Sequence, residues 1–310
     1  MEKKILVAVD GSIYSFNAIN YLSRLFTDLE DVSLHLLCVV TSTVGQAGRE
    51  WLNESEMLNI ASPETRKNVQ SARRFMNEAS LQLARRGIET EKVTTSVQLS
   101  RMGPAKDILH EARKGLYDAL VIGRRGLGKL EKLIVGSTSA TILDMCHDVP
   151  VWIIDGHVDS RKILLPVDGS PNSLRAADHL GFILDGNPHA EITLFNSEAM
   201  FASKDKINPQ EFYDRWGEEW CNKHLLRPDS LFHAPEQILI EHHFPADKIH
   251  RLGTKKGFNP SSQIVRQALI DGFGTIVMGR RGGEISKGIW KGVSDQVIAA
   301  AADVAIWIVG

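Results

Sequence analysis

The chain has 310 residues, of which 43% are hydrophobic and 24% are charged, and its formal net charge is −2. These proportions are those of an ordinary globular protein and exclude wholesale disorder, collagen and a dense disulfide scaffold. The near-neutral charge argues against a basic nucleic-acid groove, and the length favours two domains.

The cysteines and the hydrophobic pattern indicate the compartment. Cys38, Cys146 and Cys221 are odd in number and lack paired spacing, so we expect no disulfide framework. The apolar stretch at residues 5–9 is too short for a signal sequence, and no window approaches 18 uninterrupted apolar residues. We therefore expect a cytoplasmic protein without a membrane partner.

In chain order, short apolar runs alternate with stretches of helical periodicity. The runs are rich in Val, Ile and Leu and mostly continuous, which is typical of parallel strands covered on both faces. Strand–helix alternation predicts right-handed crossovers and an open α/β sheet. In the first half we predict strands at 5–9, 34–40, 92–98, 119–122 and 151–154, and helices at 12–26, 63–86, 104–114 and 137–146.

The second half repeats the first. KILVAVDGS at 4–12 returns as KILLPVDGS at 162–170, VIGRRG at 121–126 as VMGRRG at 277–282, and DVPVWII at 148–154 as DVAIWIV at 303–309. Three matches in one order indicate duplication, with domains at 1–157 and 158–310. The second set of strands is predicted at 163–167, 191–196, 248–252, 275–278 and 305–309, and the stretch 199–233 stays unassigned.

A glycine-rich segment carries most of the chemistry. It follows the fourth predicted strand and leads into the helix that begins near Ser137. Ligands of open α/β sheets bind beyond the carboxyl ends of the strands, and a helix N-terminus suits a phosphate. The segment is neither a Walker A loop nor a Rossmann fingerprint, and a surface loop that needs positive φ is the alternative.

The spacing Gly123-x2-Gly126-x9-Gly136-Ser137 resembles the nucleotide signature of the universal stress proteins. The resemblance includes the Val-Asp-Gly-Ser opening, Gly103-Pro104 and the closing apolar strand, and it covers nearly the whole chain twice. It implies two tandem five-stranded, Rossmann-like domains of the adenine nucleotide alpha hydrolase type. Their terminal strands would pair in a pseudo-dimer, and the chain could dimerise further.

The resemblance also implies a site for ATP, ADP or AMP, which Mg²⁺ or Mn²⁺ could accompany. Adenine and ribose would lie at the ends of the first two strands, and the glycine loop would hold the phosphates. Asp10 could instead be a simple turn residue, and Arg124 and Arg125 a solvated loop face. The implied binding residues are Ala8, Val9, Asp10, Val39, Gly103, Gly123, Arg124, Gly126, Gly136, Ser137 and Thr138.

The second repeat departs further from the pattern and predicts a weaker site. Val293 stands where Ser or Thr is expected, and Ser197 aligns with Val39. Ser294 could compensate for the missing hydroxyl. The corresponding residues are Pro166, Val167, Asp168, Gly279, Arg280, Gly282, Gly292, Val293 and Ser294.

Three functions remain open on the sequence. The first is a nucleotide-binding stress-response regulator with protein partners that the sequence does not identify. The second is a slow ATPase or adenylyl-transfer enzyme that uses the same pocket, although we find no catalytic dyad. The third is a non-binding scaffold. We expect surface histidines rather than a zinc site at Cys221, His224, His233 and the His242–His243 pair.

Overall fold

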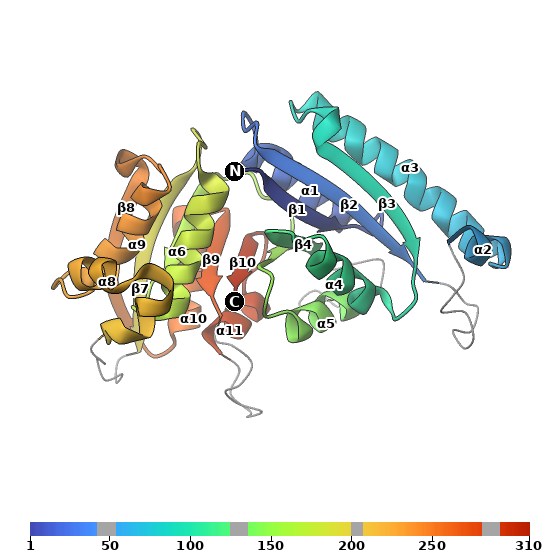
Figure 1. Ribbon diagram of the computed structural model, residues 1–310. Coiled ribbons are helices and arrows are strands. Elements are labelled where there is room, and N and C mark those ends of the chain that lie inside the picture. The colour runs from blue at the N-terminus through green and yellow to red at the C-terminus, as the bar shows by residue number, and fades with distance from the viewer. Residues whose placement is uncertain (42–53, 125–135, 200–206, 281–291) are drawn as a thin grey trace. The chain divides into compact units, whose positions relative to one another are not determined.

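The computed structural model describes residues 1–41, 54–124, 136–199, 207–280 and 292–310. The chain forms two compact units, Met1–His157 and Val158–Gly310, called unit 1 and unit 2 below. In Figure 1 the colour of unit 1 runs from blue to green and that of unit 2 from yellow-green to red.

Unit 1 is built on a parallel sheet. Within its described residues the strand order is β3-β2-β1-β4-β5. Ile5, Leu6 and Val7 in β1 and Leu120 and Val121 in β4 are completely buried, as expected for central strands covered on both faces. The strands are β1 (Lys3–Ala8), β2 (Val32–Val40), β3 (Val93–Leu99), β4 (Ala119–Gly123) and β5 (Val151–Ile154).

Local signals fix the helices of unit 1. Ser12 caps the first helix by accepting a hydrogen bond from the Ser15 amide, and Pro63 and Pro104 occupy first turns, where no amide hydrogen bond is lost. The long third helix packs on β2 and β3 (Figure 1). The helices are α1 (Ile13–Leu25), α2 (Glu54–Asn59), α3 (Pro63–Arg85), α4 (Pro104–Lys114) and α5 (Ser137–Met145).

Unit 2 has the same strand plan, in the order β10-β9-β6-β7-β8 within its described residues. Its strands are β6 (Lys162–Pro166), β7 (Glu191–Ala199), β8 (Ile249–Gly257), β9 (Thr275–Gly279) and β10 (Ala305–Val309). Its helices are α6 (Pro171–Leu184), α7 (Tyr213–Trp216), α8 (Glu218–His224), α9 (Ser230–Glu241), α10 (Pro260–Asp271) and α11 (Val293–Ala300).

The predicted α/β class and parallel sheets are confirmed, and the main differences from the predicted elements lie in unit 2. The strand predicted at 191–196 continues to Ala199. The strand predicted at 248–252 continues to Gly257, because polar residues of β8 pair with the far end of β7. The unassigned stretch holds α7, α8 and the start of α9, where Pro235 sits inside the helix.

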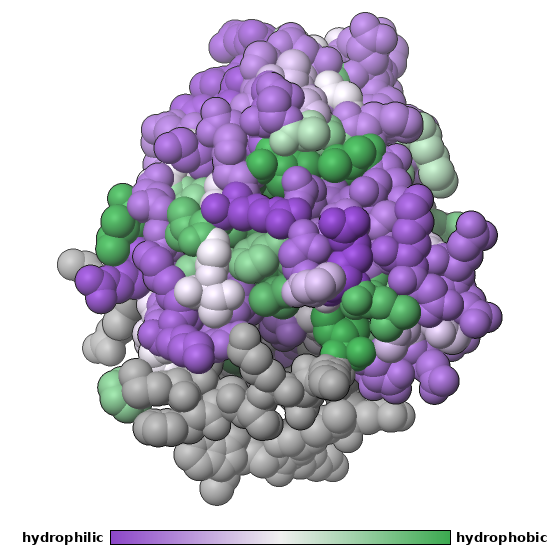
Figure 2. All heavy atoms as spheres, turned by 90° about the vertical axis from the view of Figure 1, so that its left-hand side faces the viewer, coloured by the Kyte–Doolittle hydropathy of each residue, from purple (hydrophilic) through white to green (hydrophobic). Residues whose placement is uncertain are grey.

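The surface and the cysteines agree with the composition. All three cysteines are buried free thiols. Figure 2 shows a largely hydrophilic face with scattered apolar patches. Among the described residues, we find no helix with both the length and the hydrophobicity that a bilayer span requires.

Candidate functional site

The candidate site of unit 1 lies at the carboxyl ends of β1 and β4. These two parallel strands are neighbours, but the chain continues from them toward opposite sides of the sheet. β1 pairs with β4 in register, Ala8 opposite Ile122, but the chain leaves β1 toward β2 and leaves β4 toward β5. Val9 and Asp10 follow β1, and Gly123 ends β4. This is the topological switch point of the sheet, where open α/β folds bind ligands.

Asp10 is held in a fixed orientation at this edge. Its Oδ1 accepts hydrogen bonds from the Ser12 amide at 3.0 Å and from the Ser15 hydroxyl at 2.8 Å. The Asp10 amide in turn donates to Ser15 Oγ at 2.9 Å. The Asp10 side chain is exposed, so its carboxylate is accessible to a hydroxyl group or a cation of a ligand. Sequence reasoning missed Ser15, which lies in the first turn of α1.

The start of α5 packs against the carboxyl end of β4. The Gly136 amide donates to the Arg124 carbonyl at 2.9 Å, and the Ser139 hydroxyl donates to the Gly123 carbonyl at 2.8 Å. The first α-helical bond of α5 runs from the Ala140 amide to the Gly136 carbonyl. A helix start leaves the amides before it without partners inside the helix.

No side chain caps α5, and its first turn holds no acidic residue. Ser137 is exposed, and Thr138 is partly exposed beside it. The partial positive charge of the helix start therefore lies, without an acidic residue of its own helix beside it, at the carboxyl end of β4. An anion fits this arrangement.

Arg124 does not point to solvent as a phosphate ligand would. Its Nη1 donates to Asp155 Oδ2 at 2.8 Å, and the two side chains are 1% and 8% exposed. Its amide donates to the Ile154 carbonyl at 3.0 Å. Arg124 thus ties the end of β4 to the end of β5. Sequence reasoning assigned Arg124 to phosphate and missed Asp155; this burial disfavours that role.

The expected adenine side is formed by the ends of β1 and β2. Val9 is buried and donates its amide to the Leu37 carbonyl at 2.9 Å, while Ala8 and Val39 are partly exposed. Burial, and then the charge of Asp10, raise the pKa of the neighbouring Cys38 thiol to about 11. Cys38 is therefore held at physiological pH as the neutral thiol, the less reactive form.

Gly103 lies in a loop that a buried acid organises. Its φ is +104°, a conformation that favours glycine. Asp107, in the first turn of α4, accepts from the Ser100 hydroxyl at 2.8 Å and from the amides of Arg101 at 2.9 Å and Met102 at 3.1 Å. Asp107 was also missed, because an acidic residue in a first helical turn is common.

Unit 2 holds equivalent residues in altered surroundings. Pro166 pairs with Phe195 as Ala8 pairs with Leu37, so Ser197 occupies the place of Val39. Its hydroxyl donates to Gln263 Oε1 and lies 3.3 Å from the Pro260 carbonyl oxygen, so it is engaged with α10. Asp168 is exposed, and its Oδ1 accepts from the Ser170 amide at 3.0 Å.

The remaining members of the second set lie around Val167 and the start of α11. Val167 is buried, and its carbonyl accepts from Asn196 Nδ2 at 2.6 Å. Gly279 packs tightly, since a methyl group there would meet the Asn172 carbonyl oxygen at 2.1 Å. Gly292 precedes α11, Val293 is 40% exposed and Ser294 is buried. Arg125, Gly126 and Gly282 lie outside the described residues.

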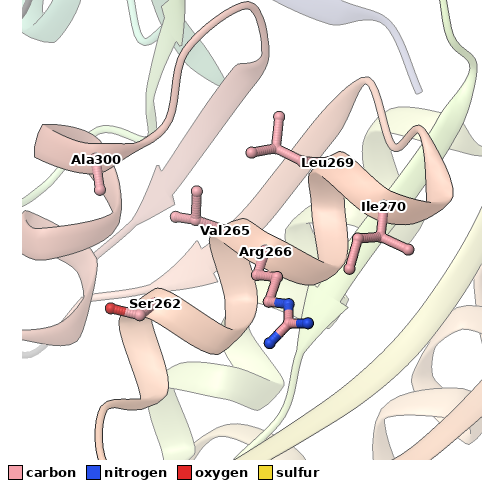
Figure 3. Close-up of a pocket in the computed structure, with 6 residues that line it drawn as sticks. All are labelled: Ser262, Val265, Arg266, Leu269, Ile270 and Ala300. Atoms are coloured by element: carbon pink, nitrogen blue, oxygen red, sulfur yellow. The ribbon is translucent and has the colours of Figure 1, made fainter.

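A shallow pocket of about 390 Å³ lies elsewhere, on α10 and the end of α11 (Figure 3). Leu269 and Ile270 are more than half exposed there. None of the predicted site residues lines it, so it gives no support to the predicted site. Its lining residues are Ser262, Val265, Arg266, Leu269, Ile270 and Ala300.

The histidines of the irregular stretch differ from the expectation. His224 is 4% exposed, and its Nδ1 lies 2.9 Å from His233 Nε2, so His224 is not the surface histidine that we expected. Burial lowers the pKa of both. Among the described residues no three His, Cys, Asp or Glu side chains gather as a metal site would require.

Comparisons with known proteins give one consistent family. The sequence model of the universal stress protein family matches residues 1–155. A universal stress protein of Mycolicibacterium smegmatis is 27% identical over 183 residues, 57% of this chain and 58% of that protein. The universal stress protein YxiE of Bacillus subtilis is 27% identical over 158 residues, 50% of this chain and 99% of its own.

A solved structure extends the likeness to both units. The crystal structure of a universal stress protein from Archaeoglobus fulgidus superposes with a TM-score of 0.64 and 19% sequence identity. It covers 99% of this chain and 97% of that one. At this identity the match establishes a shared fold over the whole chain. The match to the M. smegmatis protein spans less than two thirds of that relative.

Proposed function

The chain belongs to the universal stress protein family, and we propose that it is an adenine-nucleotide-binding regulator whose ligand is held mainly by unit 1. The observation that carries the proposal is the start of α5, joined to the end of β4 beside Asp10. An uncapped helix start supplies amides for a phosphate. Asp10 supplies an oriented acceptor for a ribose hydroxyl or a place for the accompanying cation.

The side chains at this site suit a nucleotide that is bound together with Mg²⁺. Mg²⁺ retains several waters and is commonly bound by one or two carboxylates together with substrate phosphates. Asp10 is one such carboxylate, and no three-ligand protein cage is needed. Gly123, Gly136, Ser137 and Thr138 would surround the phosphates, with Ala8, Val9, Val39 and Gly103 on the nucleoside side.

Substitution of Gly136 tests the proposal. Gly136 has φ −57° and ψ 151°, values open to any residue, so Gly136→Asp introduces no backbone strain. Thermal unfolding checks that the variant folds. Its carboxylate would cap α5, accept from the amides proposed for phosphate and repel the nucleotide. We expect ATP binding, measured by calorimetry with Mg²⁺, to weaken at least about tenfold.

The matched control is Gly292→Asp, the same change before α11. We expect it to leave the stronger ATP site unchanged, because that site lies in unit 1. A wild-type chain that ignores millimolar ATP, ADP and AMP would overturn the proposal and leave the scaffold alternative. Two equivalent ATP sites per chain would overturn the assignment to unit 1.

The enzyme alternative needs a separate measurement. Magnesium-dependent ATP turnover that disappears in Gly136→Asp would identify a slow ATPase in the same pocket. Binding without such turnover supports the regulatory role. In that role ATP must prefer one conformation of the chain, since a ligand shifts an equilibrium only through differential affinity.

A further inference from the structure

The starts of α5 and α11 are equivalent in position but differ in charge. Each helix follows a glycine with extended backbone, Gly136 and Gly292, and each first α-helical bond returns to that glycine. The third residue of α5 is Ser139, whose hydroxyl donates to the Gly123 carbonyl. The third residue of α11 is Asp295, an acid in the first turn.

The Asp295 carboxylate lies close to the start of its own helix. A methyl group placed on Gly292 would be 3.9 Å from Asp295 Oδ2. The other oxygen, Oδ1, lies 3.7 Å from Arg280 Nη2. A negative charge is thus already present where the amides and the helix dipole would attract an anion.

The arginines that follow β4 and β9 have different ion-pair partners in the two units. Arg124 and Arg280 occupy equivalent positions, since each donates its amide to the last residue of a terminal strand, Ile154 or Val309. In unit 1 the next residue is Asp155, which pairs with Arg124. In unit 2 it is Gly310, which has no side-chain carboxylate. Arg280 pairs with Asp295 instead.

We propose that Asp295 is a specificity-determining residue that serves as the resident anion at the start of α11 and keeps nucleotide phosphates out of unit 2. The inference rests on the proposed function and adds a cause for the weaker second site. Loss of a hydroxyl at Val293 removes one attractive contact. The Asp295 carboxylate adds repulsion toward a polyanion and holds Arg280 in an ion pair.

The experiment measures second-site affinity by equilibrium dialysis with Mg-ATP. Asp295→Ser introduces the residue that unit 1 has, and Asp295→Asn removes the charge while keeping the shape. We expect both to raise second-site affinity about tenfold or more, with the first site unchanged. Val293→Ser alone is the control and should produce a smaller gain. Unchanged second-site affinity in both Asp295 variants, or a larger gain from Val293→Ser alone, would overturn the inference.

The reciprocal change is made in unit 1. Ser139→Asp should weaken the first ATP site at least about tenfold, whereas Ser139→Ala, which loses only the hydroxyl bond to Gly123, should cost less. Equal losses would contradict a charge effect, and thermal unfolding of each variant checks that it folds.

The two proposals fail in different ways. A wild-type chain that binds ATP once, with no change in Asp295→Ser, rejects only the role of Asp295. A wild-type chain that binds none, with one site gained in Asp295→Ser, rejects the assignment to unit 1 and supports the role of Asp295. No binding in either chain rejects both.

Discussion

Arg124 and Asp155 form a buried ion pair that stabilises the end of the unit 1 sheet. The guanidinium is 1% exposed and the carboxylate 8% exposed, at 2.8 Å. Removing one partner of such a pair is costly, because the remaining charge stays buried without its counter-ion. We predict that Asp155→Ala lowers the free energy of unfolding of unit 1 by about 3–5 kcal/mol, measured by urea denaturation.

The control for this pair removes both charges. Arg124→Met with Asp155→Leu should recover most of the lost stability, since a buried pair is often replaceable by apolar side chains. A loss in the double variant as large as in Asp155→Ala would contradict the ion-pair explanation. The comparison is made under identical salt.

At this scale the sequence predicts where a residue lies better than what it contacts. The position of Arg124 after a buried strand follows from the repeat, but its partner comes from the end of another strand, 31 residues away. Ser15 and Asp107 were missed for a similar reason. Both are ordinary helix-start residues in the sequence, and only the folded loop shows the amides and hydroxyls that they bind.

Among the elements, the loop before α4 depends on one buried carboxylate. Asp107 accepts from Ser100, Arg101 and Met102 and so fixes the approach to Gly103. Asp107→Asn would place an amide donor where one of these donors now points. We predict a loss of about 1–3 kcal/mol in the free energy of unfolding of unit 1, measured by chemical denaturation.

A matched control is Asp144→Asn, the same chemical change at an exposed position of α5. Its effect should stay within about 0.5 kcal/mol, as for an ordinary surface substitution. If Asn at position 107 costs no more than Asn at position 144, the carboxylate does not organise the loop. ATP binding should weaken in the Asp107 variant, because Gly103 is a proposed binding residue.

Most elements could be predicted because strong local signals mark them. Buried strands such as β5 and β10 match the prediction, and Pro104 marks the start of α4 at the expected residue. β8 was predicted too short because its second half is polar and is held by pairing with β7. The stretch before α9 lacked a clear period, because α7 and α8 are only a turn or two long.

Over the whole molecule, the internal repeat is what made the fold predictable. Each half returns the same strand plan, so two weak patterns supported each other. Pairing of the two terminal strands and further dimerisation stay predictions. The position of the site at the ends of β1 and β4 and at the start of α5 could be predicted, because the order of strands and helices places these segments at one edge of the sheet. The glycine loops themselves lie outside the described residues.

The two units differ in their fully or partly buried histidines. Burial lowers the pKa of His179, which lies against Trp307 in unit 2, from 6.5 to about 3. The pKa values of His224 and His233, in the same unit, are also lowered by burial. In unit 1 burial lowers that of His35. Each of these histidines is harder to protonate in the folded chain than in the unfolded chain. Above about pH 6.5 this difference has no effect on the free energy of unfolding, and below it the free energy of unfolding falls as the pH falls.

We predict that acid weakens unit 2 more than unit 1. For His179 the loss between pH 7 and pH 5 is at most about 2 kcal/mol, since the unfolded chain takes up a proton that the folded one refuses. The pKa of the Asp178 carboxyl group is lowered from its ordinary value of 3.8. The stability that this group contributes is therefore lost only below about pH 4, outside the range compared here. Hydrogen exchange at pH 7 and pH 5, corrected for intrinsic rates, should show protection falling further in α6 and α9 than in α1 and α4. His179→Gln should reduce that difference, and equal losses in the two units would contradict the histidine explanation.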